Sequence, residues 1–304
     1  YSPTDLNNFV SCKYHIKNDL LKDELKLKKK EKNANLKLRI EYGIQHEANH
    51  FELLKTKHKK HITINPNQSA EKKCAETIKA LKDGYDLIYK AYFVDNNFRG
   101  EVDFLLKTKI KSKLGDYSYE VHDTKITKNL RPKHVLQITG YSYLLSKIQG
   151  FTPIKMYLID GANITHDFKV SEFLDYFLYT KDNFEKFLPT VEKIDLYPEK
   201  CTFCNICPWL DECEKIWVGD NYINQICGIN VSQITKLKKE NIRTVEALVT
   251  KKIDDIKSKI NPSTKIKLYE QAKLQEEKRI TGKSRFVINE TENDKGLYKM
   301  PEPN

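Results

Sequence analysis

The sequence lacks any apolar run that approaches the ~18 residues of a membrane-spanning helix. Residues 1–5 also lack the charged and apolar regions of a signal peptide. We therefore expect a soluble, cytoplasmic protein without a membrane partner. Hydrophobic residues nevertheless make up 39% of the 304 residues, which is enough for a core and excludes a wholly disordered chain.

Acidic residues are outnumbered. The chain has 53 Lys and Arg against 42 Asp and Glu, a net charge of +11. This surplus is compatible with a nucleic-acid partner, because Lys and Arg neutralise phosphates and supply most non-specific affinity. It is also compatible with a compositional bias toward Lys, Asn and Ile, so charge alone does not decide the function.

Apolar periodicity predicts the elements of the fold. Helices are predicted near the start of the chain and over residues 36–57, 70–82, 132–150 and 171–188. Runs of β-branched and aromatic residues predict strands over 87–94, 101–107, 117–125, 155–158 and 165–170. This order indicates a mixed α/β domain. Residues 222–280 show only short amphipathic helices.

Two carboxylates and a lysine lie on neighbouring predicted strands. Residues two apart on a strand share a face, so Asp123 and Lys125 project together and Thr124 faces the other side. A hairpin can bring Asp103 beside Asp123. Two carboxylates near a Lys form an oxygen-rich site for Mg²⁺ or Mn²⁺, which can activate a water beside a phosphodiester. Ordinary charges on a surface hairpin are the alternative interpretation.

Three further side chains accompany this group. His46, on an upstream helix, can add a metal ligand. Gln137 and Tyr141 are four apart and share one face of the helix that follows the strands. Other histidines are expected on the surface of a basic helical region: His15, His50, His58 and His61.

Four cysteines, Cys201, Cys204, Cys207 and Cys213, lie close together in the sequence. Spacing this tight suits a metal or a cluster better than disulfides in a Lys-rich chain without an export signal. It indicates a reducing compartment. By themselves these four residues fit a four-cysteine zinc site.

The order of these residues resembles that of the RecB-type nucleases of the PD-(D/E)XK superfamily. Their pattern is a His on an upstream helix, then G-x-x-D-F, D-x-K and Q-x-x-x-Y. The resemblance implies a restriction-endonuclease-like α/β core. It also implies that Mg²⁺ or Mn²⁺ is held by His46, Asp103, Asp123 and the main-chain carbonyl of Thr124.

The same resemblance implies the roles of the catalytic side chains. Lys125 is the catalytic lysine and acts beside Asp103 and Asp123. Gln137 and Tyr141 support the site or the DNA. Every side-chain position of the pattern is matched, so the sequence gives no sign of an inactivated copy.

The cysteines extend the resemblance. A subset of RecB-like nucleases, including AddB and the CRISPR-associated ones, combines C-x2-C-x5-C with one Cys from an N-terminal helix. Here these positions are Cys204, Cys207, Cys213 and Cys12, which implies a structural [4Fe–4S] cluster. Cys201 takes no part in that pattern. The zinc site that includes Cys201 in place of Cys12 remains the alternative.

The closest resemblance within the family covers nearly the whole chain. It implies a nuclease domain over residues 1–218, an all-α helix-hairpin-helix domain over 219–281 and a linker over 282–304. Helix-hairpin-helix elements contact a nucleic-acid backbone without reading its sequence. Asn241 stands where a glycine is usual, and Asn tolerates the left-handed turn. The linker leads toward a missing ribonuclease-H-like exonuclease domain, sometimes joined by a helicase.

From these patterns we expect a metal-dependent deoxyribonuclease that acts on single-stranded DNA or DNA ends, and an exonuclease rather than an endonuclease. One alternative is a nucleic-acid-binding module of a larger DNA-processing machine, with zinc instead of Fe–S. Another is a purely structural zinc protein.

Overall fold

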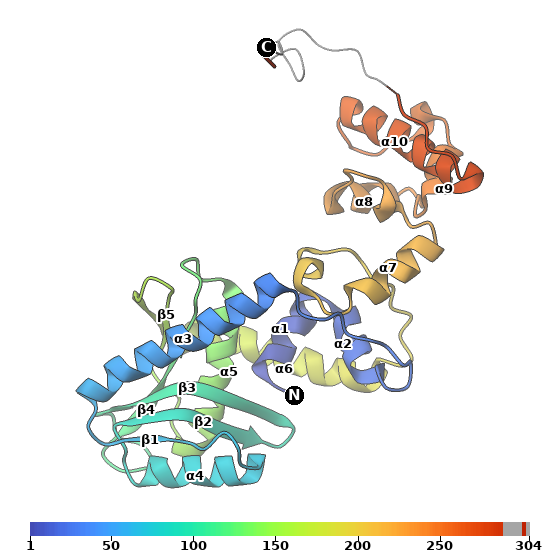
Figure 1. The fold of residues 1–304 in the computed structure, drawn as a ribbon. Coiled ribbons are helices and arrows are strands. Elements are labelled where there is room, and N and C mark those ends of the chain that lie inside the picture. The colour runs from blue at the N-terminus through green and yellow to red at the C-terminus, as the bar shows by residue number, and fades with distance from the viewer. Residues whose placement is uncertain (288–299, 302–304) are drawn as a thin grey trace. The chain divides into compact units, whose positions relative to one another are not determined.

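A six-stranded sheet forms the centre of the first part of the chain (Figure 1). The strands follow one another across the sheet in chain order: β1 (His61–Thr63), β2 (Leu87–Asp95), β3 (Phe98–Thr108), β4 (Ser118–Thr124), β5 (Lys155–Ile159) and β6 (Thr165–Lys169). The pairs β1–β2 and β4–β5 are parallel, and the other three are antiparallel. The predicted mixed α/β class is confirmed. The prediction missed β1, which has only three residues.

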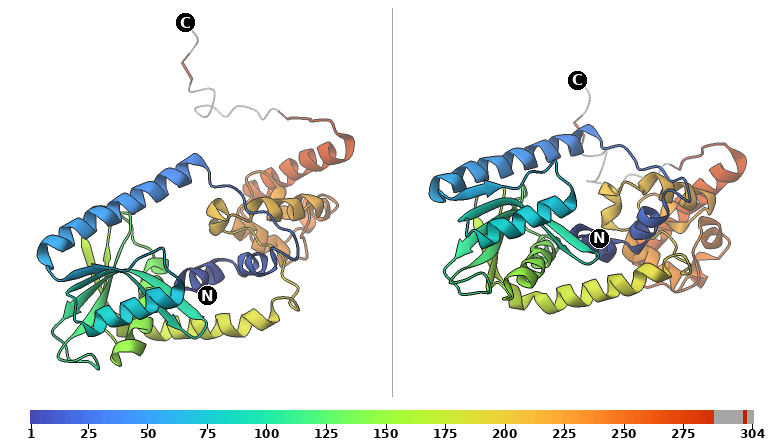
Figure 2. Two further views of the ribbon diagram at one scale, coloured as in Figure 1. Left: turned by 60° about the horizontal axis from the view of Figure 1, so that its bottom comes forward. Right: turned by 90° about the horizontal axis from the view of Figure 1, so that it is seen from below.

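Helices cover both faces of this sheet (Figures 1 and 2). The long helix α3 (Ala34–Lys57) lies on one face, and α5 (Pro132–Gln149) lies on the other. Three more helices pack around α5 or β2: α1 (Pro3–Ser11), α6 (Leu174–Phe187) and α4 (Ala70–Lys82). The prediction also missed α2 (Lys13–Leu21), which follows α1 after a break at Cys12.

Local chemistry fixes the ends of these helices. The Ser2 hydroxyl accepts a hydrogen bond from the Asp5 amide, and the Asp5 carboxylate accepts one from the Ser2 amide, which forms a capping box before α1. Helix α5 starts at Pro132, whose fixed φ suits a first turn. It ends at Gly150, which takes a left-handed φ of 61°.

Helix α5 approaches the sheet closely at one glycine. A Cβ at Gly100 would lie 2.8 Å from Cε1 of Tyr141 and 3.2 Å from Cδ1 of Leu144. Real Cβ atoms essentially never come within 3.0 Å of a neighbouring atom, so the Tyr141 ring can lie this close to β3 because residue 100 is a glycine. Leu144 and Tyr141 are both buried in the core between α5 and the sheet.

The alternation of side chains along β2 and β3 reverses at one pair of residues. Leu87 and Tyr89 face the cluster under α3, but Ala91 and Phe93 face the core under α5. A regular strand would keep residues two apart on one face. The reversal falls at Lys90, which has a left-handed φ of 60°.

Strand β3 reverses opposite the same point. Phe104 and Leu106 belong to the cluster under α3, whereas Val102 belongs to the core under α5. The strand register is Tyr89 with Phe104 on one side and Ala91 with Val102 on the other. Lys90 and Asp103 therefore lie where both strands turn over.

The chain divides into two compact units, and each is described by itself. The first is Tyr1–Glu199 with Asn205–Trp209, and the second is Lys200–Cys204 with Leu210–Asn304. The computed structural model describes residues 1–287 and 300–301, so most of the expected linker over 282–304 lies outside the described residues. No helix within the described residues has both the length and the apolarity needed to cross a bilayer.

The second unit is helical. Its helices are α7 (Leu210–Gly219), α8 (Val231–Lys238), α9 (Val245–Val249) and α10 (Pro262–Thr281). Leu237, Ile242 and Leu248 are buried between them. Asn241, in the turn between α8 and α9, has a left-handed φ of 60°, as expected for an Asn at this position.

The close approach at Gly100 leads to a stability prediction. Gly100→Ala should lower the free energy of unfolding by about 1–3 kcal/mol, because the added methyl overpacks the contact with Tyr141. Gly43→Ala is the matched control: a Cβ there meets nothing within 4 Å, and Gly43 lies inside α3. That control should stabilise the protein by about 0.5–1 kcal/mol. Urea unfolding measures both, and equal effects would contradict the packing account.

Candidate metal site

Strands β3 and β4 bring Asp103 to the end of β4. The amide and the hydroxyl of Thr124 both donate hydrogen bonds to Asp103 Oδ2, at 3.2 and 3.3 Å. Asp123 precedes Thr124 on β4 and is buried. The structure therefore gathers Asp103, Asp123 and Thr124, three of the positions that the resemblance selects, at one end of the antiparallel pair.

Lys125 follows β4 and pairs with Asp123 through its ammonium and Asp123 Oδ2. Burial raises the pKa of Asp123, the positive charge of Lys125 opposes this, and the negative charge of Asp103 adds to it. Burial alone would lower the pKa of Lys125, but the attraction of Asp123 and Asp103 outweighs burial and leaves this pKa raised. Lys125 is therefore held as a cation beside the carboxylates.

A second lysine, Lys90 on β2, reaches Asp103 as well, and the sequence analysis did not single it out. The ammonium of Lys90 lies 2.5 Å from Glu47 Oε1 and 3.2 Å from Asp103 Oδ1. A third carboxylate, Glu101 Oε1, lies 3.9 Å away. Burial acts to lower the pKa of Lys90, but Asp103 and Glu47 raise it above its ordinary value. Lys90 also has a left-handed backbone conformation, which costs about 1–3 kcal/mol for a residue other than glycine. Its side-chain contacts must therefore stabilise this conformation.

His46 stands on α3, one residue before Glu47. Its Nε2 atom is buried and has no hydrogen-bond partner among the described residues. A buried ring nitrogen without a partner loses the free energy of its hydration unless a ligand replaces water. This nitrogen therefore fits the role of a metal ligand.

The carboxylates and the imidazole of this group are suitable ligands for a divalent ion, but in this structure lysine ammonium groups lie between the carboxylates. Carboxylate oxygens and an imidazole are ligands that Mg²⁺ and Mn²⁺ accept. No group of three or more His, Cys, Asp or Glu side chains in the described part of the chain is spaced to hold a metal ion. The carboxylates of Glu47, Asp103 and Asp123 are each paired with Lys90 or Lys125 instead. An entering ion would replace part of these contacts.

Gln137 and Tyr141 interact with each other. The amide of Gln137 donates a 2.8 Å hydrogen bond to the Tyr141 hydroxyl. Burial, together with the negative charge of Asp123, raises the pKa of Tyr141, so its hydroxyl stays protonated. The pair lies on the face of α5 that packs above Gly100.

Exposed basic side chains surround the start of α5. Burial, Lys125 and Lys133 together lower the pKa of His134 to about 4. The pKa of Lys133 is itself lowered by partial burial and by the positive charges of Arg131, Lys125 and Arg39. These shifts report a positive potential beside the carboxylate group, which favours a phosphate there.

The cysteines of the expected cluster belong to both units. In the first unit, Cys12 separates α1 from α2, and Cys207 is buried. His15 Nδ1 lies 3.3 Å from Cys207 Sγ, and His15 Nε2 lies 2.9 Å from Asp19 Oδ2. The expectation that His15 is a surface residue is therefore wrong: only 4% of it is exposed, because it packs between the thiol and the carboxylate.

In the second unit, Cys204 and Cys213 are buried. The sulfur of Cys201 lies 3.8 Å from that of Cys204. A tetrahedral ion with sulfurs at ~2.3 Å spaces its ligands by about 3.8 Å, so this separation suits two ligands of one ion. Cys201 thus stays a competitor of Cys12 for the fourth place.

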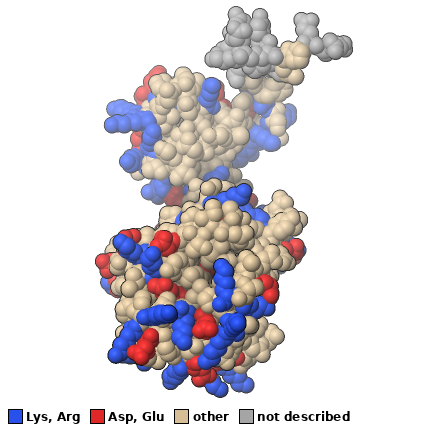
Figure 3. Space-filling view, turned by 90° about the vertical axis from the view of Figure 1, so that its left-hand side faces the viewer, with Lys and Arg blue, Asp and Glu red and all other residues tan. Residues whose placement is uncertain are grey.

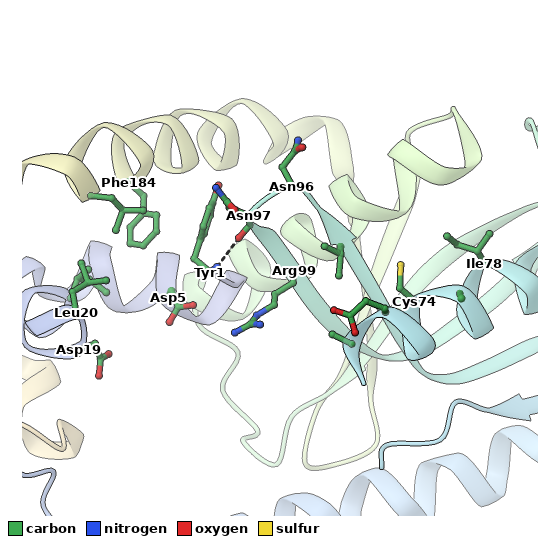
Figure 4. A pocket seen from close by; sticks show the side chains of 16 residues that line it. Tyr1, Asp5, Asp19, Leu20, Cys74, Ile78, Asn96, Asn97, Arg99 and Phe184 are labelled. Carbon is green, nitrogen blue, oxygen red and sulfur yellow. Dashed lines mark hydrogen bonds between the residues drawn. The ribbon is translucent and has the colours of Figure 1, made fainter. Parts of the chain in front are cut away.

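The first unit also has a cavity of about 920 Å³ (Figure 4). Its lining comes from α1, α2, α4, α6 and the β2–β3 turn and is largely apolar, with Arg99, Asp5 and Asp19 among its polar groups. The amino group of Tyr1 donates a hydrogen bond to the Asn97 carbonyl at its edge. None of the residues expected to bind metal lines it.

No family model matches this chain, and no curated protein matches it either.

Sequence reasoning missed three charged residues of the site: Glu47, Lys90 and Glu101. Glu47 directly follows His46 on the same helix, which is a weak signal because neighbours on a helix diverge. Lys90 interrupts the apolar run of β2, and a lone charge inside such a run was the signal that could have found it. Its left-handed backbone has no sequence signature for a lysine.

The hydrogen bond between Gln137 and Tyr141 predicts non-additive stability. Gln137→Leu should lower the free energy of unfolding by about 1–3 kcal/mol, because it leaves the buried hydroxyl unpaired. In a Tyr141→Phe background the same change should cost much less, since no hydroxyl remains to satisfy. A double-mutant cycle by urea unfolding measures the coupling. Additive effects would mean that the two side chains act independently.

Proposed function

We propose that this protein is a divalent-metal-dependent deoxyribonuclease of the RecB-like PD-(D/E)XK type, with a restriction-endonuclease-like core. One observation carries the proposal. Side chains from α3, β2, β3 and β4 and from the residue after β4 meet at one place: Glu47, Lys90, Asp103, Asp123 and Lys125 are joined through ion pairs and through Thr124. On α3, next to Glu47, the buried Nε2 of His46 has no partner among the described residues. The order α3–β1–α4–β2–β3–β4–α5–β5, with the site residues on α3, β2, β3 and β4, supports the same core.

In this proposal His46, Asp103, Asp123 and the Thr124 carbonyl hold Mg²⁺ or Mn²⁺. When bound, the ion lowers the pKa of a water and neutralises part of the phosphate charge. The protein's own groups do the rest. The Lys125 ammonium orients the attacking water and stabilises the charge that develops on the phosphoryl oxygens. Hydrolysis then forms one P–O bond to the water oxygen, which gives up a proton, and breaks the ester P–O bond, whose leaving oxygen takes up a proton.

The substrate is inferred to be DNA, as single strands or ends. The face of the first unit in Figure 3 carries Lys and Arg interspersed with Asp and Glu, so this face is not a continuous basic surface. The positive potential around Arg39, Arg131 and Lys133 is a better place for the phosphates next to the scissile one. These contacts are to the backbone, so they favour binding without sequence preference.

The cysteines are proposed to hold a structural [4Fe–4S] cluster through Cys12, Cys204, Cys207 and Cys213. A thiolate cluster of this kind contributes folding free energy by tying distant parts of the chain together. The helical second unit is proposed to contact the nucleic-acid backbone near the left-handed turn at Asn241. A fused or associated exonuclease or helicase module and a cytoplasmic location belong to the same proposal.

A second candidate is a nucleic-acid-binding module that carries zinc. The 3.8 Å separation of the Cys201 and Cys204 sulfurs favours it, because both would then ligate one ion. In that case the carboxylate group would be present but idle.

Metal-dependent cleavage of labelled single-stranded DNA tests the main proposal. Asp123→Ala and Lys125→Ala should each lower the rate with Mn²⁺ by at least about 100-fold, since each removes a charge that acts on the reacting phosphate. Lys155→Ala is the control, because Lys155 forms an exposed ion pair with Asp167 away from the site. Cleavage at the wild-type rate by either site variant would overturn the assignment.

Iron content and visible absorbance of anaerobically purified protein test the cluster. Cys12→Ser should lose the iron and the brown colour, and Cys201→Ser should keep both. The opposite result, iron lost from Cys201→Ser and kept by Cys12→Ser, would assign a local four-cysteine site. Colourless wild-type protein that contains zinc would favour the second candidate.

A further inference from the structure

The Lys90 ammonium lies where carboxylates from two elements converge. Glu47 comes from α3, and Asp103 and Glu101 come from β3. Lys90 is 2.5 Å from the first, 3.2 Å from the second and 3.9 Å from the third. The side chain of Lys90 is only 24% exposed, so water screens these contacts weakly. A single positive charge therefore serves three carboxylates.

The two oxygens of Asp103 are used differently. Oδ1 faces the Lys90 ammonium, and Oδ2 accepts from the amide and hydroxyl of Thr124. In a site with two divalent ions, the ions lie about 3.5–4 Å apart and share a carboxylate. Here the Lys90 ammonium already lies between Asp103 Oδ1 and Glu47 Oε1, where a second ion would have to bind.

The backbone is shaped to deliver this ammonium. Lys90 has a left-handed φ of 60° in the middle of β2, and the side-chain alternation reverses there. Gly or Asn would adopt that conformation with less strain. A lysine at this position is thus held against a local preference, and strain of this kind gathers at functional sites.

The charges of the group agree with one divalent ion. Lys73, Lys90 and Lys125 bring three positive charges to Glu47, Glu101, Asp103 and Asp123, which leaves one negative charge. One divalent ion together with a phosphodiester makes the set neutral. A second ion would leave two uncompensated positive charges in a partly buried site, which is unfavourable.

We propose that Lys90 is a built-in cation that takes the place of a second metal ion, so that this site binds a single divalent ion. The inference rests on the proposed nuclease function and goes beyond it by assigning the ion stoichiometry to a residue outside the family pattern. Lys90 acts here as a positioning residue: it holds Glu47 and Asp103 and keeps a second ion out.

Titration of the full-length protein with Mn²⁺, followed by the EPR signal of free Mn²⁺, tests this. Wild type should bind one Mn²⁺ at the site and Asp123→Ala none. Lys90→Gly and Lys90→Asn, which remove the charge and relieve the strain, should bind two. Lys155→Gln is the control, because Lys155 forms an exposed ion pair with Asp167 away from the site and is not among these charges. That control should still bind one.

Two ions on the wild type would overturn the inference and leave the nuclease proposal standing. One ion on folded Lys90→Gly or Lys90→Asn would also overturn the inference, because it would show that Lys90 forms ion pairs but does not exclude a second ion. No ion on the wild type would overturn both proposals. If both Lys90 variants fail to fold by circular dichroism, the wild-type count still decides, because the inference requires it to be one.

Discussion

The contact between Lys90 and Asp103 is the constraint on which the rest of the first unit depends. Both strands turn over at this pair, so that β2 and β3 present apolar side chains to α3 at one end and to α5 at the other. Without the reversal, regular alternation would have placed Ala91 and Phe93 on the face under α3. The same reversal leaves polar groups between the two apolar clusters. The polar site therefore lies at Lys90 and Asp103, where the side chains of β2 and β3 change from facing one apolar cluster to facing the other.

A site of this kind must be stable before any metal arrives. Four carboxylates near one another would repel, and burying them unpaired would cost several kcal/mol each. Lys90 and Lys125 remove that problem by pairing with Glu47, Asp103 and Asp123. The lysines thus make the metal-free fold possible. Their contacts must be partly given up on metal binding, so the stability of the resting state and the affinity for metal oppose each other.

Much of the first unit could be predicted from the sequence because its elements have strong periodicity. The limits of α3, α4, β2 and α5 follow from apolar spacing and from capping residues such as Pro132 and Gly150. Two elements were missed for different reasons. Strand β1 has only three residues, and α2, although as long as α1, buries the polar residues His15 and Asn18 and so shows no apolar stripe. Spacing along β4 placed Asp123 and Lys125 together, but no local rule could show that Lys90 would join them from β2. That contact depends on the strand reversal, which is a property of the packed sheet.

Some residues of the sequence motifs determine how the fold packs, as shown by Gly100, Tyr141 and Gln137. In the sequence they belong to two separate patterns, G-x-x-D-F and Q-x-x-x-Y. In the structure the absent side chain of Gly100 makes room for the Tyr141 ring, and Gln137 holds its hydroxyl. Asp103, three residues after Gly100, is thereby fixed relative to α5. The glycine, tyrosine and glutamine therefore need not touch a substrate to be required, because they set the distance between the helix and the strand that carries the carboxylate.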